Sequence, residues 1–191
     1  MKIVIPMAGY GTRLRPQTLE YEAVRLVRAL QKKYSHIMNM LESLPVIDEV
    51  IFIVGYLGEQ IQAYMSQTYP QLKTRFFEQT ELLGQSHAMR LARKRLRGPM
   101  LITFVDTLIE TDLHGLPSEK ADAVAWVKEV PDPRRFGVAE VNQENWVPRL
   151  VEKPQDMENN LALVGFYYFS QAERLLSAIE KQMDHNVQLK G

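Results

Sequence analysis

The chain contains no cysteine among its 191 residues. This absence excludes a disulfide framework, a thiolate nucleophile and a zinc–thiolate site, and it fits a reducing compartment such as the cytoplasm, where we expect the protein to lie. An excess of charge of either sign is also missing, because 23 lysines and arginines balance 23 aspartates and glutamates. The whole molecule therefore has no net field to attract nucleic acid or an anionic membrane, and an anionic ligand has to be bound by local groups.

Long hydrophobic runs are absent as well. The apolar segment at residues 3–5 is interrupted by Pro6 and Gly9, so it is too short for a signal-peptide core or a membrane span. Hydrophobic residues nevertheless make up 46% of the chain, enough for one substantial core. We expect a single domain over residues 1–191 that binds neither nucleic acid nor a membrane.

Strand-like and helix-like patterns alternate through the first 112 residues. Short β-branched or apolar runs predict buried strands, and apolar residues spaced three and four apart predict amphipathic helices. Such alternation is typical of an α/β fold with a mostly parallel central sheet and helices on both faces. The expected strands are 3–5, 50–54, 74–78 and 100–105, and the expected helices are 19–44, 59–69 and 86–96.

The pattern changes after Asp112. Four strand-like runs follow one another, separated by proline-rich or polar turns, before a helical pattern returns at residues 171–183. This predicts an antiparallel β extension of the same domain. The four runs are 123–130, 136–141, 147–151 and 161–169.

A glycine-rich segment, residues 8–16, directly follows the first expected strand. Glycines allow a tight turn that brings backbone N–H groups against phosphate oxygens, and Arg13 can form charge-assisted hydrogen bonds to a triphosphate. The segment is not a Walker loop, and it lacks the third glycine of the dinucleotide fingerprint. The physical interpretation is a phosphate-binding loop, and the alternative is an ordinary strand-to-helix turn with exposed arginines.

With these residues in view, the chain resembles the sugar-phosphate nucleotidyltransferases, which include glucose-1-phosphate thymidylyltransferases and uridylyltransferases. Residues 9–18 match the family signature G-x-G-T-R-L-x-P-x-T throughout. Further similar segments follow in the family's order: Gln79 with residues 83–88, then 104–107, 132–138, 151–154 and 163–167. The resemblance implies a Rossmann-like, GT-A-type domain that transfers a nucleoside monophosphate from a nucleoside triphosphate, dTTP or UTP, to a sugar 1-phosphate and releases pyrophosphate.

Asp106 is the candidate metal ligand. It follows an apolar strand, and ligands of open α/β sheets bind at the carboxyl ends of strands, so its carboxylate is well placed to hold Mg²⁺ against phosphates. The alternative is a turn or helix-capping aspartate. In the resembling family the matching aspartate binds the metal, although the usual Gly-Asp is Val105-Asp106 here.

The resemblance also implies which residues bind the nucleotide. Arg13 is expected to be catalytic and to hold the departing phosphates. Gln79 is expected to recognise the base through its side-chain amide and Gly84 through its backbone, although Gln79 is alternatively a polar turn residue. His87, a lone histidine near a helix start, is interpreted as structural. The remaining nucleotide-binding residues are Ala8, Gly9, Gly11 and Thr12.

Lys153 is the third expected catalytic residue, and the resemblance places it at the sugar phosphate. The alternative is a surface ion pair with Glu152. Gly137 lies in a strand pattern, where a missing side chain indicates a bulge or a close approach. By resemblance, Gly137, Glu152 and Leu163 bind the sugar phosphate.

The chain departs from the family pattern in two places. Residues 19–36 lack the usual lysine-proline segment, and the expected catalytic lysine falls near Ala23 or Val24, neither of which carries a charge. The sequence ends at Gly191, close to where the family continues toward a second metal-binding aspartate, so a truncated domain is expected. These departures favour an alternative, a nucleotide-binding or nucleotide-sugar-binding relative without turnover. A homo-oligomer is compatible with the sequence.

A nicotinamide-dependent oxidoreductase is a more remote alternative, suggested only by a strand followed by a glycine loop. The missing third glycine argues against it, as does the lack of an acidic residue at the end of the second expected strand, Val54-Gly55.

Overall fold

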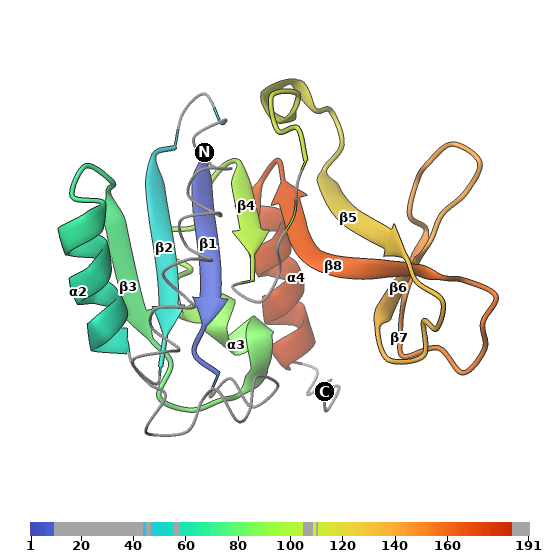
Figure 1. Cartoon of the computed structure of the whole chain (residues 1–191), viewed down its shortest axis with the longest axis horizontal. Helices are drawn as coiled ribbons and strands as arrows, with labels where there is room; N and C mark the ends of the chain where they lie inside the picture. Colours follow the sequence, from blue (N-terminus) through green and yellow to red (C-terminus); the bar gives the residue numbers. More distant parts are fainter. Residues whose placement is uncertain (10–43, 45–46, 56–57, 105–108, 110, 185–191) are drawn as a thin grey trace.

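The computed structural model describes residues 1–9, 44, 47–55, 58–104, 109 and 111–184. In these residues, eight strands form one sheet, in the order β3-β2-β1-β4-β8-β6-β7 with β5 paired to β8 (Figure 1). The strands are β1 Lys2–Met7, β2 Glu49–Val54, β3 Thr74–Glu78, β4 Met100–Thr103, β5 Ala123–Glu129, β6 Gly137–Glu140, β7 Arg149–Glu152 and β8 Leu161–Phe169.

The first four strands form the parallel half of the sheet. β1 pairs in parallel with both β2 and β4, and β2 pairs in parallel with β3. Every residue of β2 is buried, and Ile3, Val4 and Ile5 of β1 are 0% exposed. Burial on both faces explains why these strands are continuous apolar runs and not alternating ones. The prediction of a parallel central sheet is confirmed.

Helices cover both faces of this half. Ile61 and Met65 of α2 (Gly58–Thr68) belong to the core cluster that contains Ile5. On the opposite face, Met89 of α3 (Gly84–Leu91) and Ile179 of α4 (Ala172–Asp184) belong to a second cluster, which contains Val4 and Ile53. Successive residues of a strand point to opposite faces, so one strand supplies both clusters. A 3₁₀ turn at Leu116–Ser118 completes the described elements.

β8 joins the parallel half to the antiparallel half. It runs antiparallel to β4, β5 and β6, and β6 continues the sheet to β7 at its edge (Figure 1). The expected antiparallel extension is therefore present, and it belongs to the same sheet as the parallel strands.

Several predicted boundaries differ from the structure. α3 ends at Leu91 and not at 96, because residues 92–95 turn and carry Arg95 toward β2. β7 begins at Arg149, directly after Pro148, which has no N–H to donate to a neighbouring strand. The helix predicted for residues 19–44 lies outside the described residues except Leu44, which is buried in the core.

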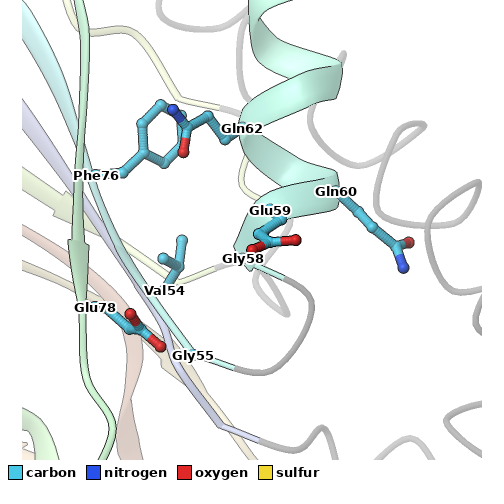
Figure 2. A pocket seen from close by; sticks show the side chains of 8 residues that line it. All are labelled: Val54, Gly55, Gly58, Glu59, Gln60, Gln62, Phe76 and Glu78. Atoms are coloured by element: carbon cyan, nitrogen blue, oxygen red, sulfur yellow. The ribbon is translucent and has the colours of Figure 1, made fainter.

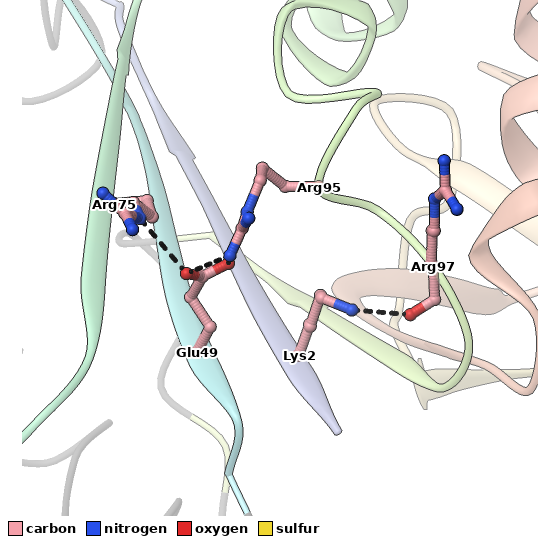
Figure 3. Close-up of polar contacts among 5 residues, drawn as sticks. All are labelled: Lys2, Glu49, Arg75, Arg95 and Arg97. Carbon is pink, nitrogen blue, oxygen red and sulfur yellow. Dashed lines mark hydrogen bonds and ion pairs between the residues drawn. The ribbon is translucent and has the colours of Figure 1, made fainter.

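A buried carboxylate fixes the amino end of the parallel strands (Figure 3). Glu49 of β2 is 2% exposed and accepts hydrogen bonds from Arg95 Nη2 at 2.8 Å and Arg75 Nε at 3.3 Å. Burial raises the pKa of Glu49, but the hydrogen bonds and charge of Arg95, the hydrogen bond from Arg75 and the charge of Lys73 together outweigh it, so this pKa lies below its ordinary value. The network ties β2 to β3 and to the connection that leads into β4.

None of the helices in the described part of the chain is long and apolar enough to cross a membrane.

Candidate functional site

The carboxyl ends of the four parallel strands meet at one edge of the sheet, where ligands of open α/β sheets bind. Ala8 and Gly9 follow β1, Gly55 follows β2, and Gln79 follows β3. A Cβ atom on Gly55 would lie 2.6 Å from the carbonyl oxygen of Ala8, so only glycine allows these two segments to approach so closely. Gly9 is exposed, and a Cβ atom there would have no neighbour within 4 Å.

Four of the predicted site residues lie outside the described residues: Gly11, Thr12, Arg13 and Asp106. β4, the strand that leads toward Asp106, ends at Thr103 beside β1. In the described part of the chain, no group of three aspartate, glutamate or histidine side chains could hold a metal ion. The prediction of Mg²⁺ therefore depends on Asp106 and stays a prediction.

Gln79 and Gly84, the predicted base-recognition pair, are in direct contact. Gln79 is 5% exposed, and its Nε2 donates to the carbonyl oxygen of Gly84 at 3.1 Å. The same nitrogen lies 3.0 Å from Nδ1 of His87 on α3. The backbone N–H of Gln79 donates to Val54 O at 2.7 Å, which anchors the residue to the end of β2. Gln79 is thus a buried amide that hydrogen bonds hold between the end of β2 and the start of α3.

Gly84 begins α3 with φ of +88°, a left-handed conformation that residues with a side chain rarely adopt. Just before it, Leu82 and Leu83 are 48% and 54% exposed, which is unusual for leucine. Two apolar side chains therefore lie open to solvent between Gln79 and the helix, where the flat apolar face of a base could pack against them.

The predicted sugar-phosphate residues come together from three strands. Gly137 of β6 lies opposite Glu152 of β7, and β8 supplies Leu163. A Cβ atom on Gly137 would lie 3.0 Å from Glu152 Oε2 and 3.3 Å from Leu163 Cδ1. The absence of a side chain at Gly137 therefore lets a carboxylate and an apolar side chain approach its backbone closely.

Lys153 follows directly after β7 in a strained conformation. Its φ is +47°, in the left-handed region, and its N–H donates to Phe136 O at 2.9 Å. Its Nζ lies 3.7 Å from Glu152 Oε1, so the ion pair expected as the alternative is present. Both side chains are 52% exposed, and an exposed pair of this kind contributes little to stability.

Tyr167 is a residue of this region to which the sequence analysis gave no role. Burial raises the pKa of its hydroxyl, and the negative charge of Glu152 raises it further. The charge of Glu152 therefore acts on this phenol.

A pocket of about 530 Å³ lies on the face of the sheet that α2 covers, opposite to α3, between α2 and the ends of β2 and β3 (Figure 2). Glu78 points to this face, whereas the next residue, Gln79, points to α3. The lining includes two carboxylates, Glu59 and Glu78, and no basic side chain among the described residues. This charge disfavours a triphosphate in the pocket. The lining residues are Val54, Gly55, Gly58, Glu59, Gln60, Gln62, Phe76 and Glu78.

Comparison with known protein families gives a match over almost the whole chain. A family model described as nucleotidyl transferase matches residues 2–189. The "Bifunctional protein GlmU" of Methanocaldococcus jannaschii is 34% identical over 181 residues, which are 95% of this chain and 42% of that protein. A glucose-1-phosphate thymidylyltransferase of Streptomyces griseus is 32% identical over 178 residues, 90% of this chain and 50% of that protein. The chain thus spans about half the length of these relatives or less.

Solved structures share the fold. A UDP-glucose pyrophosphorylase complexed with UDP-glucose superposes with a TM-score of 0.75 at 17% identity, covering 94% of this chain and 79% of that one. A glucose-1-phosphate thymidylyltransferase from Bacillus anthracis, described as putative, gives a TM-score of 0.72 at 19% identity and covers 98% of this chain and 79% of that one. These likenesses confirm the expected Rossmann-like fold.

Proposed function

Because the chain belongs to the nucleotidyl transferase family, we propose that it transfers a nucleoside monophosphate from dTTP or UTP to a sugar 1-phosphate and releases pyrophosphate. The observation that carries the proposal is the cluster of Gly137, Glu152 and Leu163, which holds a carboxylate and an apolar side chain close to a glycine backbone in the same sheet as the carboxyl ends of β1 and β3. Relatives named for thymidylyl and uridylyl transfer support the choice of nucleotide.

In the proposed reaction, an oxygen of the sugar phosphate attacks the α-phosphorus, and the bond from this phosphorus to the pyrophosphate oxygen breaks. Such a transfer depends on positioning and on neutralising charge, and it needs no protein nucleophile. Lys153 holds the attacking phosphate, and Arg13 with the amides of Gly9 and Gly11 holds the departing one. Mg²⁺ held by Asp106, when bound, neutralises charge on the triphosphate.

The residues proposed to select the base and those proposed to select the sugar lie in different halves of the sheet. Gln79 and Gly84 face the base at the end of β3, whereas Glu152 accepts a hydrogen bond from a sugar hydroxyl next to Gly137. The carboxylate of Glu152 is an acceptor only, so it fits a hydroxyl donor.

A single methyl group tests the sugar subsite. Gly137→Ala places its Cβ against Glu152 and Leu163, so we expect the KM for glucose 1-phosphate to rise about tenfold or more while the KM for the nucleotide stays unchanged. The matched control is Gly115→Ala, where a Cβ atom meets nothing within 4 Å. Pyrophosphate release with UTP, dTTP, CTP and GTP is the measurement. An unchanged sugar KM in Gly137→Ala would contradict the proposed subsite.

The second candidate function is binding of nucleotides or nucleotide sugars without turnover. Ala23 and Val24, where the family's catalytic lysine is expected, favour it. In that case UTP or dTTP raises the unfolding temperature but no pyrophosphate appears with any sugar 1-phosphate tested. Pyrophosphate release above background would exclude this candidate.

A further inference from the structure

The amide of Gln79 is held in one orientation by two acceptors. Its nitrogen faces the carbonyl oxygen of Gly84 at 3.1 Å and Nδ1 of His87 at 3.0 Å. A carbonyl oxygen only accepts hydrogen bonds, so the amide atom that faces Gly84 has to be Nε2 and not Oε1. The second N–H then donates to His87, whose Nδ1 carries no proton in this arrangement.

The opposite end of the amide, Oε1, is an acceptor without a partner among the described residues. In the part of the chain that the structure describes, no hydrogen bond reaches Gln79 Oε1. A side chain that is 5% exposed thus presents one oriented acceptor at the carboxyl end of β3.

We propose that His87 is a positioning residue that orients Gln79 so that Oε1 accepts the ring N–H of uracil or thymine. Cytosine carries an acceptor at the same ring position, so two acceptors would face each other and neither would be satisfied. This inference rests on the proposed function and deepens it, because it assigns the preference for an imide base to the pair of Gln79 and His87. Without the acceptor on His87, Gly84 alone holds the amide, and the amide can rotate.

Four variants separate this role from a structural one. His87→Phe keeps a ring of similar size and removes the acceptor. His87→Asn keeps an acceptor, because its side-chain carbonyl oxygen lies near the position of Nδ1. The side chain of His87→Gln is one carbon longer, so its carbonyl oxygen does not reach that position. His114→Phe is the control, because His114 is an exposed histidine bonded to Asp112.

The measurement is the ratio of UTP affinity to CTP affinity, obtained by calorimetry with Mg²⁺ and without turnover. We expect a ratio of about ten or more in the unmodified chain, a roughly tenfold lower ratio in His87→Phe and His87→Gln, and a ratio within about threefold of the original in His87→Asn and His114→Phe. If His87→Phe fails to fold, the comparison of His87→Asn with His87→Gln decides.

The results distinguish this inference from the function on which it rests. A ratio near one in the unmodified chain, or an unchanged ratio in both His87→Phe and His87→Gln, overturns the role of His87 and leaves nucleotide transfer intact. Failure of the unmodified chain to bind any nucleoside triphosphate overturns the proposed function and the inference with it.

Discussion

Lys153 and Asn145 have left-handed backbones without being glycine, with φ of +47° and +62°. This conformation costs most residues about 1 kcal/mol or more, whereas asparagine tolerates it comparatively well. Asn145 lies in the turn between β6 and β7, where asparagine is common. The lysine has no such local reason, so its side chain is retained against a conformational cost, as expected of a residue that binds a ligand.

Replacement of Lys153 should therefore separate stability from activity. We expect Lys153→Gly to raise the free energy of unfolding by up to about 1 kcal/mol, because the strain is relieved. We also expect it to lower pyrophosphate release about 100-fold or more, because the charge proposed to hold the sugar phosphate is lost. Denaturant unfolding and steady-state rates are the measurements.

Two further variants complete this comparison. Lys153→Ala keeps the strain and removes the charge, so it should lose activity without gaining stability. Asn145→Gly changes the other left-handed residue and should leave the rates unchanged. Full activity in both Lys153 variants would exclude a role for this lysine in transfer.

At the scale of secondary-structure elements, β2 depends on the carboxylate at its first residue. Only Glu49 of this ion pair is buried, because the Arg95 side chain is 41% exposed. Glu49→Gln therefore leaves no buried charge behind, but it weakens the charge-assisted hydrogen bonds, and we expect it to lower the free energy of unfolding by about 2 kcal/mol at pH 7. Asp132→Asn is the control, because Asp132 and Arg134 form an exposed pair; its unfolding midpoint should stay nearly unchanged.

The pH dependence of the Glu49 effect follows from the direction of its pKa shift. The pKa is lower in the folded state, so the stabilisation is fully present above the unfolded value of about 4.3 and is lost as the pH falls through the folded value. The difference between the unmodified chain and Glu49→Gln should therefore shrink below about pH 4. A difference that is constant between pH 7 and pH 3 would show that the charge of Glu49 does not matter.

Among the described residues, local patterns were sufficient to predict the strands and the helices α2, α3 and α4. β1 and β2 were recognised because burial on both faces requires continuous β-branched runs, and β8 because it is long and apolar. The Gly137–Glu152–Leu163 cluster was expected from the resemblance, and the structure brings these residues together.

Contacts between distant residues could not be predicted in this way. Arg95 reaches Glu49 across 46 positions, and this contact accompanies the early end of α3, which periodicity alone extends to Leu96. The bond between Gln79 and His87 depends on the angle at which the chain enters α3, which the left-handed Gly84 sets. The spacing of residues in the sequence does not predict this angle.

For the whole molecule, the two proposed subsites lie in different halves of one sheet. We expect UTP to slow amide hydrogen exchange mainly in residues 79–91, and glucose 1-phosphate to slow it mainly in residues 136–153, because ligand binding suppresses local opening where contacts form. Mass spectrometry of peptic peptides is the measurement, and α2 is an internal reference. Equal protection of both regions by UTP alone would contradict separate subsites.

Because β8 pairs with strands of both halves of the sheet, the two halves are not expected to fold when they are expressed separately. Its last residues pair with β4, its first residues pair with the far end of β5, and Ala162 pairs with β6. A fragment that stops before Ala123 would lack Phe166 and Tyr168, both part of the same core cluster as Ile5, and would leave β4 with an open edge prone to aggregation. Separately expressed halves should therefore be insoluble alone and gain structure only by complementation, when both are refolded together.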